Sequence, residues 1–199
     1  MTSAFPLHRY TYQDYVSLEE ESSTRHEFLA GEILAMAGGT PEHAAMAAEV
    51  IGQLREQIRG GGCRVFTSDL GVRVKATGLA TYPDASVVWG PTERDPDKKT
   101  SVTNPRVIVE VTSDSTEDYD YGEKLTHYKQ IPSLGAIVIV SHREANVDVW
   151  SRSTESPLWA RTNATAGASA VIPSLGVLLD VDAIWRAAAE TRVNCAKRR

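Results

Sequence analysis

The sequence has few cysteines and no excess of positive charge. Cys63 and Cys195 are the only two cysteines among 199 residues, so the chain has neither a disulfide framework nor a cysteine metal-ligand spacing. Lys and Arg number 21 against 26 Asp and Glu, which gives a formal net charge of -5 at pH 7. This balance argues against a strongly basic protein whose overall charge drives nucleic-acid binding. It does not exclude an enzyme with a locally basic cleft or a bound metal.

Long hydrophobic runs are also missing. No stretch approaches the ~20 apolar residues of a membrane span, and Met1 to Arg9 lacks the apolar region of a signal peptide. We therefore expect a cytoplasmic protein with no membrane partner. With 42% hydrophobic and 24% charged residues, the composition is that of a globular protein. Its length suits one domain, residues 1–199, with ends at 1–10 and 193–199 that we expect to be flexible.

Three common catalytic motifs are absent as well. The glycines at 60–62 are followed by Cys63 instead of Gly-Lys-Ser/Thr, so they do not form a phosphate-binding loop. His26-Glu27 does not begin a zinc-protease helix, because residue 30 is Ala30. No Gly-x-Ser-x-Gly motif is present, which argues against a serine hydrolase.

Local patterns predict one mixed α/β domain, a central sheet with helices packed on it. We expect helices at 11–21, 40–58, 118–130 and 181–192. We expect a hairpin of strands 26–29 and 32–36, and further strands at 64–67, 72–75, 85–89, 107–111, 136–141, 146–151, 158–161 and 177–179. The core-facing stripe of the long helix is expected to be Ala47, Ile51, Leu54 and Ile58. Strand 146–151 is expected to be relatively exposed, and 90–105 to be a polar loop.

Two carboxylates interrupt the apolar strands. Asp84 follows Pro83 at the start of strand 85–89, and Glu110 lies within strand 107–111. Burying a carboxylate among aliphatic side chains is costly unless a positive group compensates it. If these strands are neighbours, the two acids converge, and two hard oxygen donors favour Mg²⁺ or Mn²⁺ over Zn²⁺. The sequence therefore predicts a metal site at Asp84 and Glu110.

A lysine follows on the next expected helix. Asp120, Lys124 and Tyr128 are spaced four residues apart and share one helical face. If this helix packs beside the Glu110 strand, Lys124 reaches the metal site. There an amine can orient or deprotonate the attacking water, or stabilise charge that develops on a phosphate. The set favours a metal-dependent hydrolase, with phosphodiesters as the expected substrate.

These residues resemble those of the Uma2 family of restriction-type endonucleases, within the PD-(D/E)XK nuclease superfamily. The similar stretches run through most of the chain and comprise His26–Ile33, His43, Tyr82–Val88, Val109–Ser113, Ser115-Thr116, Asp120, Lys124, Tyr128, Pro132–Ala136 and Trp185. The resemblance implies a restriction-endonuclease-like fold, a central mixed β-sheet flanked by helices. It implies Asp84 and Glu110 as metal ligands and Lys124 as the catalytic lysine. Glu27 would be an accessory catalytic acid near the metal.

The sequence departs from the family pattern at two places. Two residues after Glu110 stands Thr112, where the superfamily has lysine, so Lys124 from the following helix is the natural replacement. After the turn at 132–135 the sequence reads Ala136-Ile137-Val138, where the family usually has an aromatic pair. The second departure affects packing more than chemistry.

The resemblance implies a Mg²⁺- or Mn²⁺-dependent endonuclease that acts on DNA without a small-molecule cofactor. A homodimer is expected, because cleavage of both strands usually needs two sites. A non-catalytic nucleic-acid-binding or oligomerisation module with the same fold is the alternative, and the acidic balance favours it. A nuclease for RNA or structured DNA is a third reading.

Each residue also has a structural interpretation. Asp84 could be a turn residue at the start of its strand, and Glu110 could face water on an edge strand. Asp120 and Lys124 could be an ordinary exposed helix pair, worth only ~0.3–0.5 kcal/mol. Glu27 could be a solvated hairpin residue, and His43 could be structural.

Overall fold

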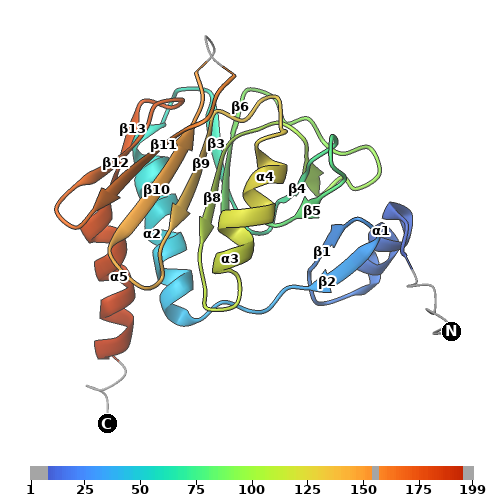
Figure 1. Cartoon of the computed structure of the whole chain (residues 1–199), viewed down its shortest axis with the longest axis horizontal. Helices are drawn as coiled ribbons and strands as arrows, with labels where there is room; N and C mark the ends of the chain where they lie inside the picture. Colours follow the sequence, from blue (N-terminus) through green and yellow to red (C-terminus); the bar gives the residue numbers. More distant parts are fainter. Residues whose placement is uncertain (1–8, 154–156, 195–199) are drawn as a thin grey trace, which may run out of the picture.

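A computed structural model of the chain describes residues 9–153 and 157–194. Its largest element is a six-stranded sheet with the order β11-β10-β9-β8-β6-β3 (Figure 1). Strands β8 and β9 are parallel, and the other neighbours are antiparallel. The bounds of the strands are Cys63–Thr67 for β3, Ala85–Trp89 for β6, Pro105–Val111 for β8, Ala136–Val140 for β9, Asn146–Ser151 for β10 and Ala160–Thr165 for β11. The predicted central mixed sheet is confirmed.

Helices α2 (Pro41–Gln57) and α5 (Val181–Asn194) pack on one face of this sheet, with the hairpin of β12 (Ser169–Ile172) and β13 (Val177–Asp180) (Figure 1). The helix α2 begins as predicted, because the Thr40 side chain accepts a hydrogen bond from the His43 backbone N–H. The predicted core stripe of this helix is partly wrong. The fully buried positions are Met46, Val50 and Leu54, whereas Ala47 and Ile51 lie at the margin of the core.

A helix with a π-helical turn in its middle covers the opposite face. The predicted single helix 118–130 consists of α3 (Glu117–Tyr119), the π-helical turn η1 (Asp120–Lys124) and α4 (Leu125–Tyr128). Side chains alternate along β8, so Val107, Val109 and Val111 pack on the α2 side while Ile108 packs against Leu125 and Tyr128. Glu110 therefore points toward the face that η1 covers.

A second sheet of five short strands has the order β2-β1-β5-β4-β7. Its strands are β1 (His26–Leu29), β2 (Glu32–Ala35), β4 (Gly71–Arg73), β5 (Ala80–Thr81) and β7 (Ser101–Val102). The predicted β1–β2 hairpin is confirmed, and its turn uses positive φ angles at Ala30 and Gly31. Helix α1 (Tyr12–Glu21) packs on β1 through Tyr15, and Thr11 with Asp14 forms a capping box at its start.

Two other expectations need correction, the exposure of strand 146–151 and the loop at 90–105. Strand β10 is not exposed, because β9 and β11 flank it and Asp148 at its centre is fully buried. Segment 90–105 is not simply a loop, because it contains β7. Of the ends expected to be flexible, residues 1–8 and 195–199 lie outside the described residues. Tyr10 is hydrogen-bonded to Gly31, and α5 continues to Asn194. Within the described ranges, no helix is long and apolar enough to cross a membrane.

Candidate active site

The amine of Lys124 lies at the centre of a buried group of acids. Its Nζ is 3.0 Å from Glu110 Oε1, 3.1 Å from Glu27 Oε1 and 3.5 Å from Asp120 Oδ1. None of these four side chains is more than 10% exposed. We call Glu27, Glu110, Asp120 and Lys124 the lysine cluster. It brings together three of the residues predicted for the site, Glu27, Glu110 and Lys124.

Three parts of the fold supply the lysine cluster. Glu110 comes from β8 of the six-stranded sheet and Glu27 from β1 of the five-stranded sheet, while Asp120 and Lys124 are the first and last residues of η1. Two hydroxyl groups donate hydrogen bonds to the carboxylates of the cluster. Tyr128 donates to Glu110 Oε1 at 2.5 Å, and Thr81 donates to Glu27. The predicted shared face of Asp120, Lys124 and Tyr128 is therefore present. Because Asp120 and Lys124 are both buried, they are not an ordinary exposed helix pair.

Asp84 lies beside this cluster, immediately before β6. The β6–β8 ladder ends with Ala85 opposite Val109, so the antiparallel register brings Asp84 opposite Glu110 at the next position. The Asp84 Oδ2 atom accepts a hydrogen bond from the Val111 backbone N–H at 2.7 Å. The two acids thus lie on adjacent strands, as the metal-site prediction requires. Asp84 is also the more accessible of the two, at 18% against 6%.

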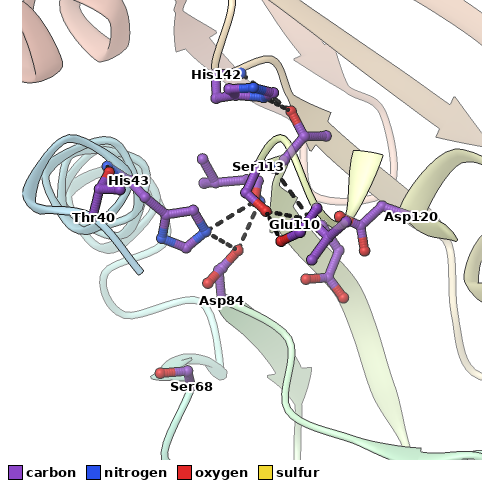
Figure 2. Close-up of polar contacts among 12 residues, drawn as sticks. Thr40, His43, Ser68, Asp84, Glu110, Ser113, Asp120 and His142 are labelled. Carbon is purple, nitrogen blue, oxygen red and sulfur yellow. Dashed lines mark hydrogen bonds and ion pairs between the residues drawn. The ribbon is translucent and has the colours of Figure 1, made fainter. Parts of the chain in front are cut away.

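His43 joins the site from the first turn of α2. Its Nε2 is 2.9 Å from the Val111 carbonyl oxygen and 3.3 Å from Asp84 Oδ2, and Figure 2 shows the ring turned toward Asp84. The hydrogen bond to Asp84 raises the pKa of His43 above its usual value. Sequence reasoning left this residue without a site role, because histidine near a helix N-terminus is usually structural. Its place in the first turn of the longest predicted helix was the available signal.

Burial and charge act in opposite directions within the lysine cluster. Burial raises the pKa of Glu110 to about 8, with added repulsion from Asp120 and Asp84, even though the Lys124 charge lowers it. Burial also raises the pKa of Asp120. Burial alone would lower the pKa of Lys124, but Glu110, Tyr128, Glu27 and Asp120 together hold it well above its usual value. Lys124 is therefore charged at neutral pH, and Glu110 keeps its proton to a higher pH than an exposed glutamate does.

The donor set fits a divalent ion held by two residues. Within residues 9–153 and 157–194, Asp84 Oδ1 and Glu110 Oε2 have no hydrogen bond or ion pair, whereas their other oxygens are engaged. Two free carboxylate oxygens at adjacent strand positions suit Mg²⁺ or Mn²⁺, which usually keep several waters. In the same ranges no three His, Cys, Asp or Glu side chains are grouped to hold a metal. Water or substrate oxygens would have to complete the coordination.

Thr112, at the position where the superfamily has lysine, is not part of the lysine cluster. Its Oγ1 lies 2.8 Å from His142 Nδ1 and accepts a hydrogen bond from the His142 backbone N–H. The residue is fully buried. Its hydroxyl therefore joins the end of β8 to the segment after β9, and the amine of the site comes from η1.

This chain is similar to several known proteins. An uncharacterized protein of Synechocystis, slr1290, is 31% identical over 182 residues, which cover 91% of this chain and 94% of the relative. Another uncharacterized Synechocystis protein, sll1609, is 28% identical over 130 residues, or 65% of this chain and 73% of the relative. The crystal structure of a putative nuclease belonging to DUF820 from Anabaena variabilis superposes with a TM-score of 0.70 at 15% identity. That match covers 87% of this chain and 98% of the other, and it confirms the predicted fold class.

The profile of one protein family matches most of the chain. The family is Uma2, described as "Putative restriction endonuclease", and the match extends over residues 12–182. This range includes Glu27, Asp84, Glu110 and Lys124. The chain therefore belongs to the Uma2 family.

Proposed function

We propose that this protein is an endonuclease that hydrolyses DNA phosphodiester bonds with Mg²⁺ or Mn²⁺. Its family and the nuclease fold it shares support a nuclease-like function. The observation that carries the proposal is the position of the Lys124 amine, which lies 3.0 Å from Glu110 Oε1. Glu110 in turn stands opposite Asp84 in the β6–β8 register. Two acids and an amine so arranged suit metal-assisted hydrolysis of a phosphate ester.

Each residue of the site has its own role in the proposed reaction. Asp84 and Glu110 would hold the ion, which when bound supplies charge that neutralises the phosphate and a more acidic water. Lys124 stabilises negative charge that develops on phosphorus. The raised pKa of its amine favours this role over removal of a proton from water. Glu27 and Asp120 hold the amine in place, and Tyr128 orients Glu110.

A non-catalytic module with the same fold is the second candidate, and one observation favours it. The Lys124 side chain is only 6% exposed and its amine has three carboxylate neighbours, so the lysine cluster is also consistent with a buried structural network. Such a network needs no metal. Binding of Mn²⁺ therefore separates the two functions. Calorimetry should detect a site in the wild type that is lost in Asp84→Asn, and a wild type without Mn²⁺ binding would favour the module.

A plasmid-nicking assay with Mg²⁺ or Mn²⁺ tests the activity itself. Glu110→Gln and Lys124→Met should each abolish nicking. Lys98→Met is the matched control, because Lys98 is also a buried lysine, and none of its partners Tyr82, Thr100 and Glu19 belongs to the lysine cluster. This variant should lose stability yet keep nicking DNA. Nicking that survives both site substitutions would refute the assigned residues.

The proposal includes a homodimer, because a single site faces one strand of a duplex at a time. Two copies would bring two sites to the two strands. Sedimentation of the protein with and without a DNA duplex measures this. A species of monomer mass under both conditions, in a preparation that cuts both strands, would contradict it.

A further inference from the structure

A second buried acid lies in line with Glu110. Glu110 is paired with Ile139 in the β8–β9 register, and Ile139 is paired with Asp148 in the β9–β10 register. Ile139 packs with Leu125 and Tyr128, so this row lies on the face that the helix of α3, η1 and α4 covers. Neighbouring strands are ~4.8 Å apart, so the row separates the two acid positions by about 10 Å.

Asp148 is a fully buried carboxylate that remains ionised. Arg161 donates two hydrogen bonds to it, from Nε at 2.9 Å and from a terminal nitrogen at 2.8 Å, and Asn163 Nδ2 donates a third at 2.9 Å. Burial would raise the pKa of Asp148, but the bonds from Arg161, Asn163 and Tyr121 lower it overall. A buried carboxylate can stay charged only when donors of this kind compensate for its lost contact with water.

Tyr121 connects this carboxylate to the site. Its hydroxyl donates to Asp148 Oδ2 at 2.8 Å, and Tyr121 lies three residues before Lys124 within η1. The five-residue turn is thus attached at both ends of the row, by Lys124 to Glu110 and by Tyr121 to Asp148. A short segment held at two points cannot slide or rotate without breaking one attachment. Single π-helical turns are frequent at functional sites.

We propose that the Tyr121–Asp148 hydrogen bond is a positioning contact that sets where the Lys124 amine lies over Glu110. Its meaning for catalysis rests on the proposed nuclease function. Neither residue belongs to the lysine cluster, so they act through Lys124. Arg161 and Asn163 hold Asp148 from β11, so the edge strand supports the amine across three neighbouring strands.

The test compares two tyrosine substitutions. Tyr121→Phe removes the positioning bond and leaves Asp148 its three other donors. Tyr12→Phe is the matched control, because the Tyr12 hydroxyl donates to Asp95 Oδ2 at the same 2.8 Å, far from η1 in the sequence. The first readout is the rate at which the folded protein is acetylated at Lys124 by an N-hydroxysuccinimide ester, followed by peptide mass spectrometry. Tyr121→Phe should raise this rate about tenfold, the factor for a hydrogen bond to a charged group worth about 1.5 kcal/mol.

The second readout is plasmid nicking. Tyr121→Phe should lower kcat and leave KM unchanged, whereas Tyr12→Phe should change neither. A Lys124 acetylation rate equal to that of the wild type in Tyr121→Phe, or an equal increase in Tyr12→Phe, overturns the proposal. If Tyr121→Phe does not fold, Asp148→Asn weakens the same bond from its acceptor side and is read in the same way. A wild type that nicks no DNA refutes the proposed function, while the acetylation rates still decide the positioning role.

Discussion

Glu110→Gln should change how the stability of the protein depends on pH. Burial raises the pKa of Glu110 from 4.5 to about 8, so between these values the folded state keeps a proton that the unfolded state has lost. Stability then falls as pH rises, because the folded state binds more protons. The slope is about 1.4 kcal/mol for each pH unit, up to about 4 kcal/mol between pH 5 and pH 8. A glutamine carries no proton to lose, so the variant should keep this free energy.

The assay is equilibrium unfolding in urea at pH 5, 6, 7 and 8 for both proteins. The raised pKa of Asp120 acts in the same direction, but both proteins share it, so it cancels in the difference. The raised pKa of His43 also acts in this direction, and only the smaller part that comes from Glu110 differs between the two proteins. Glu19→Gln is the control, because the pKa of Glu19 is lowered by bonds from Tyr82 and His26 that outweigh its burial. Stability from Glu19 is present above its ordinary pKa and lost in more acidic solution, so this variant should follow the wild-type slope from pH 5 to pH 8. Parallel curves for wild type and Glu110→Gln would refute the reasoning.

Two further predictions concern the charges around Glu110. Lys124→Met should lower the free energy of unfolding by about 3–5 kcal/mol at pH 8, because it leaves buried carboxylates without their cation. The loss should be smaller at pH 5, where Glu110 is protonated, and urea unfolding that shows equal losses would contradict this. Mn²⁺ should raise the Tm more at pH 8 than at pH 6, since binding requires Glu110 to release its proton. Scanning calorimetry measures the shift, and the same shift in Asp84→Asn would count against a site at these acids.

The sequence predicts the acids of the site because their surroundings are unusual. Glu110 stands within a run of branched aliphatics, and Asp84 follows a proline at the start of another such run. Period-two and period-four patterns then place the strands and the Asp120–Lys124–Tyr128 face. These are local signals, and the β6–β8 pairing of the structure agrees with them. What the acids and the lysine do in a reaction stays a prediction.

The remaining features depend on contacts distant in sequence. The π-helical turn is not visible in a pattern that reads equally well as a regular helix. Asp148 alternates with valines along β10, a pattern typical of a half-exposed strand, and only the partners Arg161 and Tyr121 explain its burial. His43 meets Asp84 because α2 begins beside the end of β8, which depends on the packing of the helix on the sheet.

The origin of Glu27 in the five-stranded sheet has a consequence for biogenesis. This acid is made early in synthesis, whereas Glu110 and Lys124 emerge more than eighty residues later. The amine can acquire its full set of counter-charges only after the amino-terminal hairpin has docked against the later half of the chain. The lysine cluster is therefore complete only when both sheets have folded and packed together. A copy of the chain without its amino-terminal hairpin would keep the large sheet but would leave Lys124 without the Glu27 carboxylate.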